Sequence, residues 1–385
     1  MRSTVAVGAS AAWLPMFGAE GQDKKDKKQV QGQEATANTY TIKMSHVHNG
    51  PSEPRKIDIP DVEGYRVLKG DFHIHTLFSD GAVMPVDRVH EAVLNGLDVI
   101  AITDHIEYRP FFSGGGKWKL AGEQGSNHNM AYEIALPEAE KKKLLLVRGT
   151  EITKGQMPPG HFNALFATDI NPIAAAVDDW RRMLQVAAEQ GAFLLWNHPG
   201  WEAQIGNGAP LRFTDEHIDA WKNGWLHGVE IFNYDEYYPV VSDWCNKYDL
   251  ALFANSDIHE SELSLYGLHS LQRPITLVLA KERTLDSIKE AMFARRTVAW
   301  AADTLWGREP WMTALFKASV TVKTVSAGRL EITNKSSLPV TASIGGAQFR
   351  LTQNVARQFF CPDNVNKIQV TNWFTAMNCP LEVNI

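Results

Sequence analysis

Residues 71–76 read Asp71-Phe72-His73-Ile74-His75-Thr76. In an extended strand, residues i and i+2 face the same side, so the two imidazoles are expected to project together. Taken alone, the pair is equally compatible with metal ligands and with half-buried histidines that make local hydrogen bonds. The surrounding sequence decides between these interpretations.

Short apolar runs alternate with segments of helical spacing on the C-terminal side of this stretch. The predicted strands span residues 72–76, 97–103, 144–151, 162–167, 192–197, 229–233, 251–255 and 275–279. The predicted helices span residues 85–95, 127–143, 173–190, 214–223, 240–248 and 285–294. This alternation predicts an α/β fold with a parallel sheet, and seven or so such units predict a closed barrel.

Beyond about residue 310 the helical pattern stops, and strand-like pieces follow at Leu330–Thr333, Val340–Ile344, Ile368–Thr371 and Leu381–Ile385. We therefore expect a leader and linker over residues 1–60, the barrel over 61–305, and a small all-β domain over 310–385. Cys361 and Cys379 both lie in this last region, where they could pair in an exported protein.

The N-terminus begins with Met1-Arg2, an apolar stretch over residues 5–17, and the small residues Gly18-Ala19. This pattern is typical of a short secretory signal and predicts a periplasmic or secreted protein. The alternative is a leader without a targeting role in a cytoplasmic protein. No other segment is long and apolar enough to span a bilayer. The formal net charge of −6 argues against general nucleic-acid binding, which needs a basic surface.

Potential metal ligands fall at the ends of the predicted strands, where barrel enzymes place their chemistry. The exception is His161, which opens its strand and can join the others if that strand begins at the same rim. Histidines scattered through a core would not be arranged in this way. The candidate ligands are His73, His75, Asp80, His105, Glu151, His161, His198, Asp257 and His259.

Imidazoles and carboxylates without thiolates suit Mn, Zn or Fe(II) and argue against a structural zinc site of the cysteine type. Nine ligands exceed the needs of one ion, so we expect a multinuclear site. Divalent ions lower the pKa of bound water from about 15.7 to about 7, which predicts a metal-bound hydroxide near Glu151 as the nucleophile.

In this order, the motifs resemble those of the PHP (polymerase and histidinol phosphatase) superfamily. The matching elements are His73-x-His75, Ser79-Asp80-Gly81, Thr103-Asp104-His105, Glu151, His161, His198 and Asp257-x-His259. The resemblance covers residues 70 to about 300 and implies a distorted (β/α)7 barrel with three divalent metals.

The resemblance also implies how the ligands are shared among the ions. The first ion would be held by His73, His75, Glu151 and Asp257. Glu151 would bridge to a second ion, bound also by His161 and His198. The third would be held by Asp80, His105 and His259. Every ligand position of the motif set is filled, which argues against a decayed copy.

The leader, the segment Ile59–Tyr65 and the β-rich tail resemble a bacterial exported subgroup associated with phosphodiester hydrolysis. The resemblance implies hydrolysis of small organic phosphodiesters. Two alternatives stay open: a phosphomonoesterase using the same metals, and a surface- or carbohydrate-binding protein acting through its C-terminal region. The amidohydrolase superfamily also begins with His-x-His, but it would place a lysine at Glu151 and does not predict Asp257-x-His259.

Other side chains are candidates for assisting the reaction. Lys154, Arg109 and Arg273 would supply positive charge near the rim, and His269 would protonate the leaving group. Each has a structural alternative, as a solvated surface charge for the three cations and as a supporting residue for His269.

Overall fold

The computed structural model describes residues 54–108, 127–206, 209–267, 271–362 and 365–385. Its helices are α1 (Pro85–Leu94), α2 (Met130–Lys142), α3 (Asn171–Ala174), α4 (Trp180–Glu189), α5 (Glu202–Ile205), α6 (Asp215–Lys222), α7 (Val241–Tyr248), α8 (Glu262–Leu265), α9 (Leu285–Phe293) and α10 (Glu309–Ser319). None of these helices is long and apolar enough to cross a membrane.

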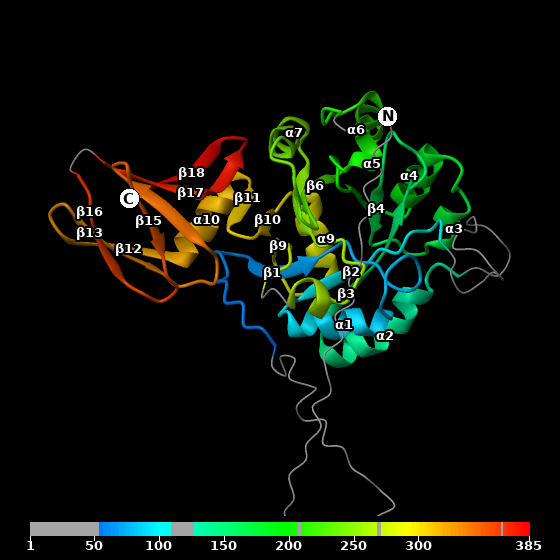
Figure 1. Cartoon of the computed structure of the whole chain (residues 1–385), viewed down its shortest axis with the longest axis horizontal. Coiled ribbons are helices and arrows are strands. Elements are labelled where there is room, and N and C mark those ends of the chain that lie inside the picture. The colour runs from blue at the N-terminus through cyan, green and yellow to red at the C-terminus, as the bar shows by residue number, and fades with distance from the viewer. Residues whose placement is uncertain (1–53, 109–126, 207–208, 268–270, 363–364) are drawn as a thin grey trace, which may run out of the picture. The chain divides into compact units, whose positions relative to one another are not determined.

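The first eleven strands belong to the region expected to form the barrel (Figure 1). They are β1 (Arg66–Asp71), β2 (Val99–Ile102), β3 (Leu145–Ile152), β4 (Phe162–Leu165), β5 (Phe193–Trp196), β6 (Gly228–Asn233), β7 (Glu236–Tyr237), β8 (Ala251–Asn255), β9 (Ile275–Ala280), β10 (Thr297–Ala301) and β11 (Thr304–Gly307). The C-terminal strands are β12 (Val320–Ser326), β13 (Arg329–Asn334), β14 (Val340–Ile344), β15 (Ala347–Leu351), β16 (Arg357–Phe360), β17 (Lys367–Ala376) and β18 (Cys379–Asn384).

The described residues form a mixed α/β structure with one large sheet. Its hydrogen-bonded order is β15-β14-β17-β11-β10-β9-β1-β2-β3-β4-β5-β6-β7, with β18 beside β17 and β8 beside β6. The expected closed barrel is not confirmed, because among the described strands no regular ladder connects β8 back to β1 or β9. An isolated parallel bridge between Ile74 and Ile258 joins the segments that follow β1 and β8.

The prediction of a parallel sheet holds for part of the sheet only. The pairs β1–β2, β2–β3, β5–β6 and β6–β8 are parallel, but β4 is antiparallel to both β3 and β5. Residues 153–161 alone connect β3 to β4, and a parallel crossover needs about a dozen residues or more. The chain therefore reverses here. Strand β9 is likewise antiparallel to β1.

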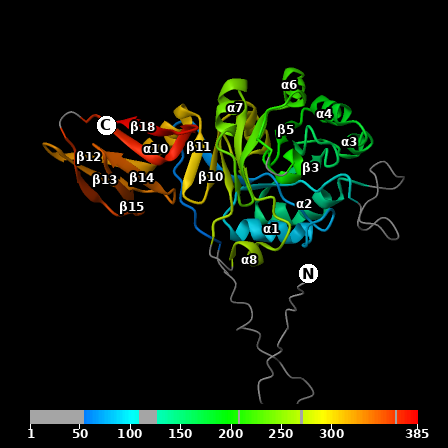
Figure 2. The ribbon, with the colours of Figure 1, turned by 45° about the horizontal axis from the view of Figure 1, so that its top comes forward.

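Helices α1 and α2 contact each other and lie on one side of strands β1–β3 (Figures 1 and 2). The buried residues of α1 are Pro85, Arg88, Val89 and Ala92, at the spacing of one helical face. On the inner side of the sheet, Phe72, Phe193 and Phe253 are fully buried and pack together, with ring centroids 5.5–5.9 Å apart in successive pairs.

Two expectations about element limits are wrong. The first strand ends at Asp71, so the residues expected to form it, 72–76, follow it as an irregular extension. The helical pattern does not stop near residue 310, because α10 follows, with Met312, Leu315, Phe316 and Ser319 buried at helical spacing.

The C-terminal all-β domain is not confirmed. It would include α10, and β17 pairs in parallel with β11, so the large sheet continues across the expected limit. The limits 61–305 and 310–385 therefore stay predictions. Cys361 and Cys379, which could have formed a disulfide, are free thiols, as is the buried Cys245.

Candidate metal centre

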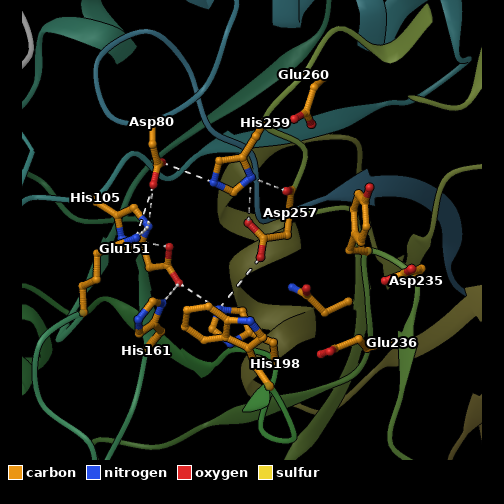
Figure 3. Close-up of a pocket in the computed structure, with 14 residues that line it drawn as sticks. Asp80, His105, Glu151, His161, His198, Asp235, Glu236, Asp257, His259 and Glu260 are labelled. Carbon is orange, nitrogen blue, oxygen red and sulfur yellow. Dashed lines mark hydrogen bonds and ion pairs between the residues drawn. The ribbon is translucent and has the colours of Figure 1, made fainter. Parts of the chain in front are cut away.

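Seven of the nine candidate ligands line one pocket of about 470 Å³, shown in Figure 3, and all nine belong to groups whose ligand atoms lie close together. The lining of the pocket consists of Asp80, His105, Glu151, Lys154, His161, His198, Trp201, Asn233, Tyr234, Asp235, Glu236, Asp257, His259 and Glu260. His73 and His75 lie deeper and are fully buried.

The segments after β1 and β8 run side by side and present three of the ligands together. The Asp257 amide donates to the His73 carbonyl at 2.9 Å, and the His75 amide donates to the Ile258 carbonyl at 3.1 Å. The Nε2 atoms of His73 and His75 lie 3.2 Å apart. Asp257 Oδ1 lies 3.2 Å from the first and 3.0 Å from the second.

Glu151, in β3, lies at the centre of the cluster, and its two oxygens face different imidazoles. Oε2 lies 3.4 Å from His73 Nε2 and 3.1 Å from His105 Nδ1. Oε1 lies 2.9 Å from His161 Nδ1 and 3.3 Å from His198 Nε2. A carboxylate placed in this way can bridge two ions.

Asp80 occupies the outer end of the cluster. Its oxygens lie 3.2 Å from His259 Nε2, 3.7 Å from His105 Nε2 and 3.2 Å from Lys154 Nζ. The rings of His75 and His259 stack with centroids 4.2 Å apart. The turn that carries Asp80 is narrow, since a Cβ on Gly81 would lie 2.6 Å from the His75 backbone.

Four overlapping groups have ligand atoms within 4.8 Å of one another. They are His73, His75 and Glu151; His73, His198 and Asp257; His105, Glu151 and His161; and His75, Asp80, His105 and His259. Together they include all nine candidate ligands. His105 belongs to two groups, although the resemblance places it only with Asp80 and His259.

The charges of the cluster suit cations. Burial alone would raise the pKa of the Glu151 carboxyl, but His105, His73 and His161 hold it well below its ordinary value. Burial lowers the pKa values of His105 and His161. Against the effect of burial, Asp257 and Glu151 raise the pKa of His75 to about 9. Protons on buried imidazoles thus supply positive charge that divalent ions can replace.

Three buried atoms of candidate ligands indicate whether the site suits metal ions. His105 Nδ1, His161 Nε2 and Asp257 Oδ1 make no hydrogen bond of good geometry among the described residues, although Glu151 Oε2 lies 3.1 Å from the first and imidazole nitrogens lie 3.0–3.2 Å from the last. A buried polar atom without a partner costs about 1–3 kcal/mol. Coordination of a cation would satisfy all three, so the residues present fit divalent metals.

Several supporting residues were not identified from the sequence. The buried guanidinium of Arg88, in α1, donates to the carbonyls of His75, Ile258 and His259 at 2.8–3.1 Å, and so ties two ligand-bearing segments together. Glu230, in β6, contacts His73 Nδ1 at 2.9 Å. A charged residue inside an apolar strand or on the buried face of a helix was the available signal.

The other sequence candidates have different positions. Arg273 was expected at the rim but is 1% exposed and pairs with the buried carboxylate of Asp71, which needs a counter-charge. Lys154 lines the pocket, with its Nζ 2.8 Å from His105 Nε2 and close to the face of the Tyr108 ring. Arg109 and His269 lie outside the described residues.

Comparisons with known proteins show which family this chain belongs to. Neither a family model nor a curated protein matches the sequence. One solved structure is a two-domain protein from Bacteroides vulgatus ATCC 8482 that contains a predicted PHP-like metal-dependent phosphoesterase. It is 34% identical, with a TM-score of 0.78, over 87% of this chain and 99% of that one.

Two further structures are much less similar. A protein of Bifidobacterium adolescentis ATCC 15703, named as a metal-dependent phosphoesterase, is 17% identical with a TM-score of 0.39, over 59% of this chain and 96% of that one. An amidohydrolase from Chromobacterium violaceum is 14% identical with a TM-score of 0.35, over 50% and 87%. Neither similarity is close enough to assign a function to this chain. Identity of about a third over nearly all of the Bacteroides protein shows that this chain belongs to the PHP-like metal-dependent phosphoesterases.

Proposed function

We propose that this protein hydrolyses small organic phosphodiesters with three divalent ions, Mn, Zn or Fe, held by the nine ligands. The observation that carries the proposal is the convergence of all nine in four overlapping groups at one pocket. When bound, such ions acidify water and neutralise the oxygens of a phosphoryl group.

The chain's own residues would keep the site charged correctly and position the ester. Asp80, Glu151 and Asp257 have lowered pKa values against the effect of burial, so they stay ionised and bind cations at neutral pH. Lys154 Nζ, 3.2 Å from Asp80, lies where it can orient a phosphoryl oxygen.

The pocket charge favours a diester over a monoester. Asp235, Glu236 and Glu260 line the pocket and belong to none of the ligand groups. Among the described lining residues, Lys154 is the one lysine or arginine. A diester carries one negative charge and a monoester nearly two at neutral pH, so these carboxylates repel the diester less.

The pocket also offers contacts for a second ester group. Trp201 and Tyr234, 36% and 41% exposed, both line it. Such aromatic faces bury apolar groups of a ligand and give them few geometric constraints. A monoester has no second group to fill this space.

The test uses protein purified without chelator. Metals are measured, removed, and restored one at a time, and hydrolysis of bis(4-nitrophenyl) phosphate is compared with that of 4-nitrophenyl phosphate. We expect activity to depend on metal and kcat/KM to favour the diester. A thousandfold preference for the monoester would reject the diester assignment, and full activity in His73→Ala would reject the site.

We also propose that residues 61–305 form a distorted (β/α)7 barrel, closed between β8 and its neighbours β1 and β9, and that residues 310–385 form a small, mainly β domain. Besides the bridge between Ile74 and Ile258, the Thr276 hydroxyl bonds the Ala254 amide and carbonyl, both at 2.9 Å, and so joins β8 to β9. An experimental structure with water-filled space between β8 and β9 would contradict closure. Export is likewise proposed, and cell fractionation tests it.

A further inference from the structure

Glu230 is a fully buried carboxylate in the middle of β6, a strand with every residue buried. It is neither a candidate metal ligand nor part of the pocket lining. A charged group in such a place is retained only where partners compensate it. Its partners therefore indicate what it does.

Both oxygens of Glu230 accept hydrogen bonds. Oε1 lies 2.9 Å from His73 Nδ1 and accepts from Asn255 Nδ2 at 2.8 Å. Oε2 accepts from the backbone amide of His198 and from Asn233 Nδ2, both at 2.8 Å. Glu230 thus contacts two ligands of one group, since His73 and His198 meet there with Asp257.

A β-bulge produces this arrangement. The register between β6 and β8 shifts between Glu230 and Phe232, so Ile231 is the extra residue. In a regular strand, residues 230 and 233 would face opposite sides. The bulge turns Asn233 to the side of Glu230, where its amide contacts the carboxylate.

The contact to Nδ1 determines where His73 carries its proton. The other three contacts of the carboxylate all come from N–H donors, so Glu230 acts as an acceptor, and in this arrangement Nδ1 is the donor in the 2.9 Å contact. Asn233 Nδ2, which only donates, lies a longer 3.4 Å from the same atom and donates to Glu230 Oε2 at 2.8 Å. The Nε2 lone pair then faces Asp257 Oδ1 at 3.2 Å and Glu151 Oε2 at 3.4 Å, inside the cluster.

We infer that Glu230 is a positioning residue that fixes His73 as its Nδ1–H tautomer and holds His198 in register with it for metal binding. The inference rests on the proposed metal site and is independent of the ester that is cleaved. It assigns a role to a side chain that touches neither metal nor substrate.

Glu230→Gln tests this inference with little change in shape. A glutamine that keeps its oxygen on the His198 amide and Asn233 turns its NH₂ toward His73 Nδ1. That nitrogen must then accept, which moves the proton to Nε2, the atom that faces the cluster. We expect zinc affinity, measured by titration with a zinc-buffered chelator, to fall about 10- to 100-fold.

Asp71→Asn is a matched control, because Asp71 is an equally buried carboxylate that bonds Ser256 and Arg273 and contacts no ligand side chain. We expect its zinc affinity to stay within about threefold of wild type. Unfolding of both variants in chelator separates general damage from lost metal binding. A Glu230→Gln protein that binds zinc as wild type does, or an equal loss in both variants, overturns the inference.

A second measurement needs no variant at Glu230. In zinc-loaded wild type labelled with ¹⁵N-histidine, with His73→Gln to assign the signal, His73 should show a protonated Nδ1 and a metal-bound Nε2. The opposite assignment overturns the inference even if Glu230→Gln fails to fold. Wild-type protein that binds no zinc, manganese or iron would instead reject the proposed function.

Discussion

Replacing Arg273 with methionine should destabilise the protein without changing its chemistry. The guanidinium is 1% exposed, the Asp71 carboxylate 0%, and Arg273 also donates to the Ser256 hydroxyl at 2.9 Å. Methionine has a similar length, so the main loss is the charge. Removing one partner of a buried ion pair costs about 3–5 kcal/mol, because the other charge stays buried and unpaired. Amides of Ser256 and His73 still donate to Asp71, which favours the lower value, about 3 kcal/mol.

Urea unfolding of wild type, Arg273→Met, Asp71→Asn and the double variant gives the coupling between the two charges. We expect Arg273→Met to lose about 3 kcal/mol and the double variant to recover part of it, since no charge is left unpaired. Turnover per folded molecule should stay within about threefold of wild type. An unchanged unfolding midpoint with a hundredfold loss of kcat would refute this reasoning and return Arg273 to a catalytic role.

Three further results are expected. Removing metal with EDTA should lower the free energy of unfolding by about 2.7 kcal/mol for each bound ion, relative to protein at a hundredfold excess of metal over Kd. Calorimetry with and without chelator measures this loss, and no change would mean that the folded state binds no metal. Asp235→Asn, Glu236→Gln and Glu260→Gln each remove one negative charge from the pocket. Each should raise the ratio of kcat/KM for the monoester to kcat/KM for the diester about twofold. An unchanged ratio would remove the charge argument for a diester. Burial lowers the pKa of His217 from 6.5 to about 4. As the pH falls, the imidazole is therefore protonated in the unfolded chain before it is protonated in the folded protein. The free energy of unfolding should fall by about 3 kcal/mol between pH 6.5 and pH 4. His217→Gln should reduce this fall in the free energy of unfolding, measured with urea at several pH values. A variant whose stability changes with pH in parallel with wild type would contradict the prediction.

The grouping of the candidate ligands could be predicted because these residues follow a positional rule. Side chains at strand ends project into the space that barrel enzymes use, and His105 and Glu151 each follow a recognisable apolar run. The reversal at β4 does have a sequence signal, because residues 153–161 are too short a connection for a parallel crossover from β3. Helix α10 was not predicted although Met312, Leu315 and Phe316 have helical spacing, because it is followed directly by strand β12.

The supporting residues could not be found in the same way. Glu230 lies in a run read as a plain buried strand, and only the bulge at Ile231 brings Asn233 beside it. A bulge changes which face a side chain occupies, and the one-dimensional pattern of apolar residues does not record it. Arg273 was misplaced for a related reason, since its partner Asp71 is 202 positions away in the sequence.

Backbone geometry at two ligands shows why the site depends on long-range contacts. His198 and Asp257 have φ angles of 27° and 50°, in the region that side chains other than glycine seldom adopt. Such residues cost about 1–3 kcal/mol each unless the surroundings fix them. Here the His198 amide donates to Glu230, and the Asp257 amide donates to the His73 carbonyl. Both contacts come from other strands or their extensions, so the ligand geometry exists only once the sheet has assembled. Metal binding then adds to the stability of a conformation that the fold has already selected.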